Sequence, residues 1–575
     1  MFRRNEEHRQ TAMFSSIYEL PKKQLKRLQE SWAGTFYREF FLRVEEDFFA
    51  VLYSEEPSRP NIPINVLMGL ETLKSGYGWS DEELYDAFCY NMQVRYALGY
   101  RDLKEGHFEL RTLYNFRRRI TQYMQRTGIN LIEKAFEQVT DEQTEAFQLK
   151  TGKLRMDSTQ IASNIREMSR LQLLVEVLQR VHRMLSEEDQ EHYKKDFEAY
   201  LQGTSGQYIY RIKGHEVADH LQPIGELMYR LVEELQADYG QEPTYQMLVR
   251  VFQEHFTLDD DLCPKKGKEL SAGSLQSPDD WEATYRRKND AGHRGYVANL
   301  TETCDPENKF QLINKVQVEP NNTEDADMLK EALPDLKART DVDQINTDGG
   351  YGSPAVDEVM REAKVEQIQT AIRGRKPAEE KLGLEDFDWE IDDDGKPQEV
   401  ICPHGQRVQV QPGRNEDRYL AYFDSIVCND CPFVDQCPTK PLKRKPKYVL
   451  RFSQPETDLA LRRKRSAEVR ATGRNLRAGA ESTMRSVKHP FRNGKLPVRG
   501  KPRVSMMVIA SATMTNIRRI HGYQEKLREA KRKARAIQKQ MEEAMKNVFV
   551  FFLGFLHRCL LQHSYSKMAV KAIPI

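Results

Sequence analysis

The sequence has no long hydrophobic run at its start and almost no net charge. Its first ten residues, MFRRNEEHRQ, lack the apolar stretch of a signal peptide, so we do not expect export. The one apolar run, VFVFFLGF at 548–555, is shorter than a membrane span of about 20 residues, and it predicts either an exposed tail or a buried terminal helix. The formal net charge of +1 argues against a general binder of polyanions. We therefore expect a cytoplasmic protein without a membrane partner.

Internal repeats and low-complexity tracts are also absent. The 575 residues suffice for three or four domains, and 39% hydrophobic with 30% charged residues is typical of a globular protein. The charge is unevenly spread, however. Residues 440–503 hold 20 Lys or Arg against four acids, whereas EDFDWEIDDDG at 385–395 is strongly acidic. The basic block is large enough to contact a phosphate backbone, and a solvated basic surface is the plainer alternative.

The first 150 residues predict helices. Residues 60–91 have the pattern of a helix, a turn and a second helix, which Ser80 caps with Glu83 three residues on. Residues 107–125 form a further amphipathic helix, which carries Arg117, Arg118 and Arg119. Such a domain can dock on DNA through its last helix, and dimerisation or packing is the alternative.

The middle of the chain alternates between strand and helix patterns. A short strand that ends near Asp157 is predicted in KLRMDSTQIASN (153–164). Further strands are predicted at 295–306, at 309–320, in the first part of 341–354 and at 365–372, with a hairpin turn between 295–306 and 309–320. Helices are predicted at 323–335 and after residue 353, and a long helical stretch without a catalytic motif fills about 168–258. This order predicts a mixed α/β layer.

Two acids follow predicted strands of this layer. Asp157 lies in MDST, at the expected end of the first strand, and Asp348 lies where a strand meets DGGYGSP. Glycines there let the backbone turn sharply and let a ligand approach, and ligands of open α/β sheets collect at the carboxyl ends of strands. Each acid taken singly is more simply a turn former or a helix cap.

A third acid, Glu481, stands in the basic stretch RNLRAGAESTMRSVKHPF at 474–491. A continuous helix would place it in one sector of roughly 80° with four cations, Arg474, Arg477, Arg485 and Lys488. The opposite sector would then face the core through Leu476, Ala480, Met484 and Val487. A solvated face with one ion pair between Arg477 and Glu481 is the plain interpretation. Together with the two Asp residues, however, Glu481 completes three acids without a nucleophile, which is what two divalent metals acting on a phosphodiester require.

These motifs resemble the DDE transposases of bacterial insertion sequences. MDSTQIASN is similar to the segment with the family's first catalytic Asp, NTDGGYGSP to that with the second, and RAGAESTMRSVKHP to its Glu-bearing helix. RPNIPINVLMGLETL through YNFRRRI resembles the family's helical N-terminal domain. A subgroup carries Tyr-x2-Arg-x3-Glu-x6-Lys, which this chain matches at Arg477, Glu481 and Lys488, with Arg474 in place of the Tyr.

The resemblance implies an α/β fold with an RNase H-like mixed-sheet core. It implies that Asp157, Asp348 and Glu481 hold two Mg²⁺ or Mn²⁺ ions, and that the enzyme cleaves the element's ends and joins them to target DNA. Double-stranded DNA is then the partner, held by Arg117, Arg118, Arg119, Arg474, Arg477, Arg485 and Lys488. We further expect a homodimer on DNA and a cytoplasmic, nucleoid-associated location.

The resulting domain prediction has five parts. Residues 1–150 form a helical, DNA-binding N-terminal domain, and residues 151–375 form the first part of the core with the helical insertion. Residues 376–455 are an inserted cysteine-rich segment, 456–522 complete the core with the Glu helix, and 523–575 form a charged helix with an apolar tail.

Four of the eight cysteines cluster in the inserted segment. Cys402 lies in ICPHG, and Cys428, Cys431 and Cys437 lie in CNDCPFVDQC. This spacing suits tetrahedral binding of one structural Zn²⁺, and free or disulfide-linked thiols are the alternative. Because the segment is charged and has little apolar content, we expect the metal rather than a core of its own to hold it folded.

Two other functions fit the same motifs. One is a DNA-binding regulator that derives from a transposase and no longer transposes. The other is an RNase H-like nuclease that hydrolyses DNA without joining it. The presence of all three acids favours an active transposase.

Overall fold

The computed structural model describes the chain except for residues 7, 9–14, 57–58, 103, 260, 289–290, 373–379, 393, 416, 474 and 570–575. It divides into two compact units, Met1–Ile517 and Arg518–Ile575. We describe each unit by itself.

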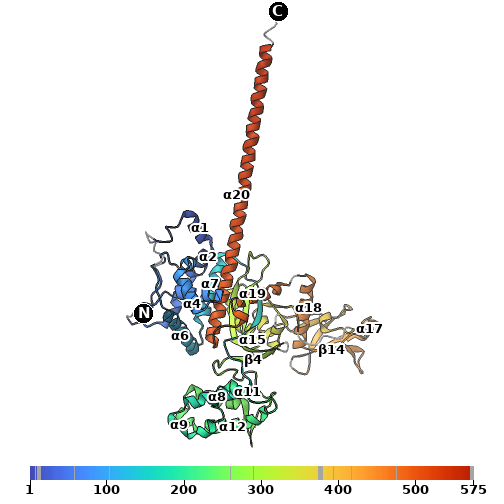
Figure 1. Cartoon of the computed structure of the whole chain (residues 1–575). Helices are drawn as coiled ribbons and strands as arrows, with labels where there is room; N and C mark the ends of the chain where they lie inside the picture. Colours follow the sequence, from blue (N-terminus) through green and yellow to red (C-terminus); the bar gives the residue numbers. More distant parts are fainter. Residues whose placement is uncertain are drawn as a thin grey trace, which may run out of the picture. The chain divides into compact units, whose positions relative to one another are not determined.

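The N-terminal part of the first unit is helical, as predicted (Figure 1). Its helices are α1 (Lys22–Glu30), α2 (Trp32–Glu39), α3 (Ile64–Tyr77), α4 (Asp81–Tyr90), α5 (Met92–Ala97), α6 (Leu110–Thr127) and α7 (Leu131–Ala146). The predicted capping box is present, because the Ser80 hydroxyl accepts from the Glu83 amide and the Glu83 carboxylate accepts from the Ser80 amide. These helices share one apolar core with strands of the sheet and with the start of the last helix.

A mixed six-stranded sheet follows, in the order β4-β5-β1-β7-β8. The sixth strand, β6, pairs with β5 along the edge opposite β1. Its strands are β1 (Lys153–Ile161), β4 (Thr284–Lys288), β5 (Ala291–Thr303), β6 (Ile313–Pro320), β7 (Gln344–Thr347) and β8 (Glu366–Gln369). β5 runs antiparallel to β1 and β6, whereas β7 runs parallel to β1 and β8. This arrangement confirms the predicted mixed-sheet core, including the hairpin of β5 and β6.

Two helices cover one face of this sheet, α15 (Asp325–Arg339) and α16 (Pro354–Glu362). Alternate residues of β1, Leu154 and Met156, are fully buried in a cluster with Leu329 and Leu333 of α15 and Val356 of α16. The alternation follows from the two-residue repeat of a strand, which sends the residues between them to the opposite face.

The predicted helical insertion is also present. It contains α8 (Arg170–Met184), α9 (Glu187–His192), α10 (Lys194–Phe197), α11 (Ser205–Tyr210), α12 (Val217–Glu234), α13 (Gln236–Tyr239) and α14 (Pro243–His255), followed by the short hairpin of β2 (Phe256–Leu258) and β3 (Leu262–Pro264). The insertion has an apolar core of its own, built mainly from α8, α12 and α14.

The cysteine-containing segment is a second sheet, in the order β13-β14-β12-β11-β10-β9. Its strands are β9 (Asp388–Ile391), β10 (Pro397–Ile401), β11 (Arg407–Pro412), β12 (Arg418–Asp424), β13 (Lys440–Pro441) and β14 (Lys447–Ser453), with the short helix α17 (Ser425–Asn429). The segment has its own apolar cluster, which includes Phe387, Phe423 and Phe452. The expectation that it lacks a core was therefore wrong, because aromatic residues spread over separate strands meet only once the strands pair.

The last part of the first unit contains α18 (Gln454–Ala471) and α19 (Ala480–Lys488). The stretch 474–491 is not one continuous helix, since a 3-10 turn (Leu476–Gly479) precedes α19. The predicted core-facing residues Ala480, Met484 and Val487 are nevertheless buried.

Helix α20 (Lys501–Ala569) crosses the boundary between the two units. In the first unit its residues Val504, Val508 and Ile517 are buried in the large core. In the second unit the apolar residues from Val548 to Leu561 are exposed. Phe551, for example, has 78% of its surface exposed and Phe549 has 63%. By length and composition alone α20 is long and apolar enough to cross a membrane. The sequence prediction rested only on the eight-residue run 548–555 and therefore missed this property of the longer helix.

Candidate active site

Asp157, Asp348 and Glu481 line one groove of the first unit, although they lie far apart in the sequence. The groove has a volume of about 560 Å³. Four cations line it with the acids, namely Lys288, Arg477, Arg485 and Lys488. The structure therefore brings together the three predicted acids and three of the cations predicted around Glu481.

The sequence predicted Asp157 at the end of a strand, but Asp157 lies in the middle of β1. The strand β7 pairs with β1 only as far as Arg155, opposite Asn346. Continuing this parallel register by two residues places Asp157 beside Asp348. Both acids thus lie just beyond the carboxyl end of β7, where β1 continues without β7 as its neighbour.

Asp348 caps the turn that follows β7, because its Oδ1 accepts from the Gly350 amide at 2.7 Å. The glycines of DGGYGSP do not adopt left-handed backbone angles. Gly349 is required for a different reason, since a Cβ at this position would lie 2.4 Å from the Ala371 carbonyl oxygen. What approaches this glycine closely is therefore the chain after β8 and not a ligand.

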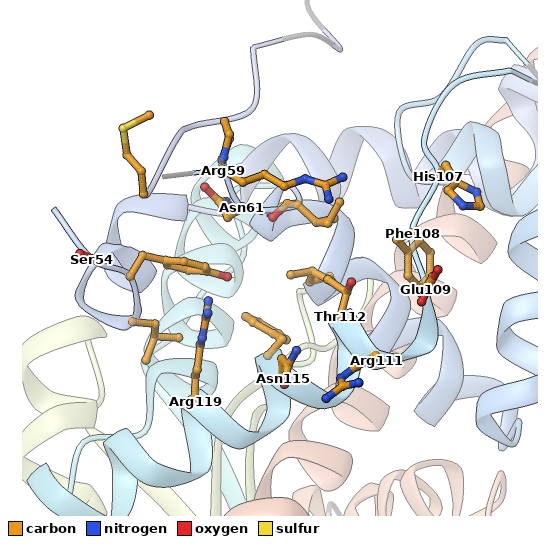
Figure 2. Close-up of a pocket in the computed structure, with 17 residues that line it drawn as sticks. Ser54, Arg59, Asn61, His107, Phe108, Glu109, Arg111, Thr112, Asn115 and Arg119 are labelled. Atoms are coloured by element: carbon orange, nitrogen blue, oxygen red, sulfur yellow. Dashed lines mark hydrogen bonds between the residues drawn. The ribbon is translucent and has the colours of Figure 1, made fainter. Parts of the chain in front are cut away.

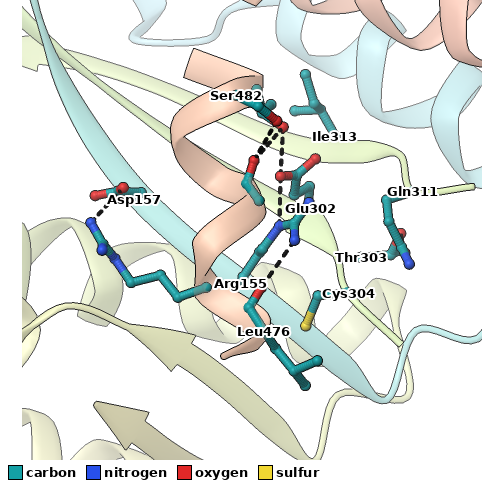
Figure 3. Close-up of polar contacts among 12 residues, drawn as sticks. Arg155, Asp157, Glu302, Thr303, Cys304, Gln311, Ile313, Leu476 and Ser482 are labelled. Atoms are coloured by element: carbon teal, nitrogen blue, oxygen red, sulfur yellow. Dashed lines mark hydrogen bonds and ion pairs between the residues drawn. The ribbon is translucent and has the colours of Figure 1, made fainter. Parts of the chain in front are cut away.

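Asp157 is buried, and Arg477 is its charged partner. Arg477 Nη2 donates to Asp157 Oδ2 at 2.8 Å (Figure 3). Ser158 N donates to Asp157 Oδ1 at 3.0 Å. Burial raises the pKa of Asp157, Arg477 opposes that rise, and the charges of Asp348 and Asp325 add to it. Asp157 is thus a carboxylate whose charge depends on a nearby cation.

Glu481 is in the first turn of α19, and 74% of its side-chain surface is exposed. Its Oε1 lies 3.9 Å from Arg477 Nη1, so the predicted ion pair is present. Arg477 thereby lies between two of the three acids. In the described part of the chain, no group of three or more His, Cys, Asp or Glu side chains is arranged as a preformed metal site. The donor set, oxygen atoms from three carboxylates around one groove, nevertheless has the chemistry that Mg²⁺ or Mn²⁺ prefers.

A buried network that sequence reasoning missed holds α19 against the sheet. Arg155 Nε donates to Glu302 Oε1 at 2.7 Å, and Thr483 of α19 donates to the same oxygen at 2.7 Å (Figure 3). Arg155 Nη1 also donates to the Leu476 carbonyl at 2.9 Å. Arg155 and Glu302 face each other across the β1–β5 pairing, a relation that becomes visible only when the register of the strands is known.

A fourth acid, Asp325, also escaped the sequence analysis. It is buried at the start of α15, and its Oδ1 accepts from the Ser158 hydroxyl at 2.7 Å. An acid at the start of the predicted helix 323–335, directly after a strand, was the available signal. Through Ser158, Asp325 restrains the segment of β1 that carries Asp157.

The cations of the groove differ in their freedom. Lys488 is half-buried, and its Nζ donates to the Gln160 carbonyl at 2.9 Å and to Thr159 Oγ1 at 3.3 Å. Burial lowers the pKa of Lys488. Arg485 is exposed, and Arg474 lies outside the described residues. Arg477 and Lys488 therefore hold the groove together as well as lining it.

Arg117, Arg118 and Arg119 of α6 have three different environments. Arg117 donates to Glu71 at 2.6 Å and to both Asp81 oxygens at 2.7 and 3.0 Å. Its role in DNA contact stays a prediction, and it would require Arg117 to leave these acids. The guanidinium is taken up by interior acids. Arg118 is exposed, and Arg119 lies with Arg59 and Arg111 around a pocket of about 540 Å³ (Figure 2). The Arg119 guanidinium carbon lies 4.7 Å from the ring centroid of Tyr53.

The four clustered cysteines are half-buried free thiols. Burial and the three neighbouring thiols of the cluster raise the pKa of Cys428 to about 11. Cys402 Sγ accepts from the Gln406 amide at 3.3 Å, and Cys437 Sγ accepts from Thr439 Oγ1 at 3.2 Å. The thiols thus lie near one another, although they are not in the preformed geometry of a metal site.

Two family models match the chain. Residues 25–119 match "Transposase domain (DUF772)" and residues 401–521 match "Transposase DDE domain". The second match includes Glu481 and the four clustered cysteines, and neither match extends over Asp157 or Asp348. Comparison with curated proteins and with solved structures gave no match. The chain therefore has a transposase domain near its N-terminus and, after it, a transposase DDE domain that carries the groove's glutamate, in line with the resemblance to the transposases of insertion sequences.

Proposed function

We propose that the groove is the active site of a transposase that cleaves the ends of its element and joins them to target DNA. A transposase binds DNA, and a DDE domain implies a divalent metal. The observation that carries the proposal is the meeting of Asp157, Asp348 and Glu481 in one groove with Arg477, Arg485 and Lys488. Two bound metal ions would supply an activated water or 3′-hydroxyl and would stabilise the leaving oxygen.

The chain's own residues then have distinct tasks. Asp157 lies on β1 and Asp348 directly follows the neighbouring strand β7, which makes them the rigid part of the site. Glu481 is exposed on a helix and is the acid that can adjust. Arg477 neutralises Asp157 and Glu481 in the structure described here, so it must give up at least one of these contacts when a metal binds. Once released, the Arg477 guanidinium can bind two oxygens of a phosphate, because its bidentate geometry suits phosphate as well as carboxylate groups.

The proposal is tested with a duplex that carries the element's terminal repeat. Wild-type protein with Mg²⁺ should nick the duplex and transfer the new end to a second duplex. Asp348→Asn should bind the same duplex and do neither. Cleavage without transfer would instead indicate a nuclease, and binding without either step in the wild-type chain would indicate a DNA-binding regulator. We place the enzyme in the cytoplasm at the nucleoid and propose that it acts as a homodimer.

We also propose that Cys402, Cys428, Cys431 and Cys437 bind one structural Zn²⁺. Two hydrogen bonds support this proposal, one from the Gln406 amide to Cys402 Sγ and one from the Thr439 hydroxyl to Cys437 Sγ. Hydrogen bonds to sulfur orient and stabilise thiolate ligands. Because the segment has a core of its own, the metal would brace the turn after β10 against α17 rather than fold the whole segment. Elemental analysis should find about one zinc per chain, and Cys431→Ser should lose it. A metal-free wild-type protein would refute the site.

A further inference from the structure

A second cavity, of about 590 Å³, lies between the helical insertion and the strands β4 and β5. Its wall includes Arg170 and His255 from the insertion, Arg286 and Arg287 from β4, and Arg294 from β5. We propose that this cavity binds a backbone phosphate of the DNA that the acid-lined groove processes. The inference rests on the proposed function, and it assigns part of the DNA contact to the insertion.

Buried polar atoms without partners point to a ligand. Among the residues that the structure describes, both ring nitrogens of His255, the hydroxyl of Ser274 and Nε of Arg170 have no hydrogen-bond partner. All three residues line the cavity, where His255 is only 4% exposed and Ser274 only 5%. Buried polar groups without partners are costly, at about 1–3 kcal/mol each, and are therefore uncommon. A ligand that reaches into the cavity would satisfy them.

The chemistry of these atoms selects an anion. The guanidinium of Arg170 can only donate, and the hydroxyl of Ser274 can donate. Burial and the nearby charges of Arg170 and Lys265 lower the pKa of His255 to about 4, so its imidazole is neutral and offers one N–H. Three donors without partners among the residues of one cavity wall match an acceptor-only group such as a phosphate.

The charge balance points the same way. The hydrogen bonds of Arg170 go to the carbonyls of His255 and Lys265, both at 2.6 Å, and that of Arg286 goes to the Thr323 carbonyl at 3.2 Å. Carbonyls bring no full negative charge to offset the two guanidinium groups. The one acid in the cavity wall is Glu324, against four arginines, of which Arg294 also lies 3.8 Å from Glu167 outside the wall. The wall therefore has an excess of positive charge.

The position along β4 favours DNA over a free anion. Arg286 and Arg287 line the cavity, and the next residue, Lys288, lines the acid-lined groove. One strand thus presents three successive cations to the two sites, and Figure 1 shows this strand on the side of the sheet toward α8 and α11. A duplex seated in the groove can continue past Lys288, so that the cavity takes one of its phosphates.

The test compares two variants of the full-length protein. One variant is Arg286→Gln/Arg287→Gln. For this double variant, a plot of the logarithm of the duplex-binding constant against the logarithm of the salt concentration should have a slope smaller in magnitude by about 1–2, because each lost phosphate contact removes about 0.9. Arg211→Gln is the control, because Arg211 is an exposed arginine of the insertion that does not line the cavity. The control should keep the wild-type slope, and both variants should keep the wild-type melting temperature.

A second measurement covers the case in which the double variant is unstable. Ser271 is exposed in the cavity wall, so Ser271→Cys in a Cys263→Ser/Cys559→Ser background should exchange with a mixed disulfide tethered to the backbone of a duplex, forming a protein–DNA disulfide and releasing the small thiol. The same background without the new cysteine should not. Wild-type protein that fails to bind the duplex would overturn the proposed function. Wild-type binding with an unchanged slope in the double variant and no cross-link would overturn only the phosphate site, and loss of the cross-link in millimolar inorganic phosphate would assign the cavity to free phosphate.

Discussion

Helices α18 and α19 are neighbours in the sequence and both are rich in arginine and lysine, yet they use these charges differently. Four consecutive cations of α18 each meet an acid of the chain, in the pairs Arg462–Asp357, Arg463–Glu385, Lys464–Asp388 and Arg465–Glu366. Around α19, by contrast, Arg477, Arg485 and Lys488 line the groove with the three acids. Two of the α18 partners, Glu385 and Asp388, come from the acidic stretch 385–395.

The difference shows that the charge of a segment does not measure the charge available to a ligand. The acidic stretch and the basic block, opposite in sign along the sequence, neutralise each other in part where α18 meets the second sheet. The cations that line the groove stand there with the three acids that we propose as metal ligands. The following predictions separate these two groups of residues.

The largest expected effect is on cleavage. Asp157→Asn should reduce the rate of DNA cleavage by roughly 10³-fold or more, because a lost metal ligand removes several kcal/mol of transition-state stabilisation. Duplex binding should change little. The matched control is Asp357→Asn, at a half-buried acid that pairs with Arg462 of α18, and it should alter stability without abolishing cleavage. Equal loss of cleavage in both variants would contradict the assignment.

The next effect is on stability and reaches the site through α19. Glu302→Ala leaves the buried guanidinium of Arg155 without its carboxylate, which should lower the free energy of unfolding by about 3–5 kcal/mol. Thr483→Val removes one hydrogen bond to the same carboxylate and should cost about 1 kcal/mol. Urea denaturation measures both. If the two variants were equally stable, the network would not be what holds α19 to β1 and β5.

A smaller effect is expected at Gly479, the residue before α19. A Cβ there would lie 2.1 Å from Arg155 Nη1, so Gly479→Ala should displace the Arg155 side chain and cost about 1–3 kcal/mol. Gly473→Ala provides the contrast. Its Cβ would meet no atom within 4 Å, although its φ of +67° carries a backbone penalty. Stability similar to the wild type in Gly479→Ala, measured by thermal unfolding, would show that Arg155 has room to move.

The smallest effect separates the two helices directly. Arg485→Ala should reduce the slope of the salt dependence of duplex binding by about 1. Arg463→Ala, on α18, should leave that slope unchanged and slightly lower the melting temperature. The reverse result would mean that α18 carries the DNA contact and that its ion pairs open on binding.

Much of the architecture was readable from local patterns. Strand alternation around Leu154 and Met156, the capping box at Ser80 and the turn at Asp348 are local features, and each predicted its element correctly. The three acids were selected by residue type and spacing, and the structure places them in one groove. The Arg477–Glu481 pair followed from a separation of four residues in the sequence.

Other features depended on contacts between distant segments. Arg155 meets Glu302 and Thr483, Ser158 meets Asp325, and Arg117 meets interior acids, through pairings that span tens to hundreds of residues. The aromatic core of the cysteine segment is of the same kind. No periodicity in one segment reports which partner will face it.

The sequence by itself determined the order of helices and strands, the three acids and the cysteine spacing, because these depend on backbone preferences and residue chemistry within a few positions. Only the tertiary structure decided which cations are neutralised and which line a site. Charge neutralisation depends on distance in space, and strand register together with helix packing sets that distance.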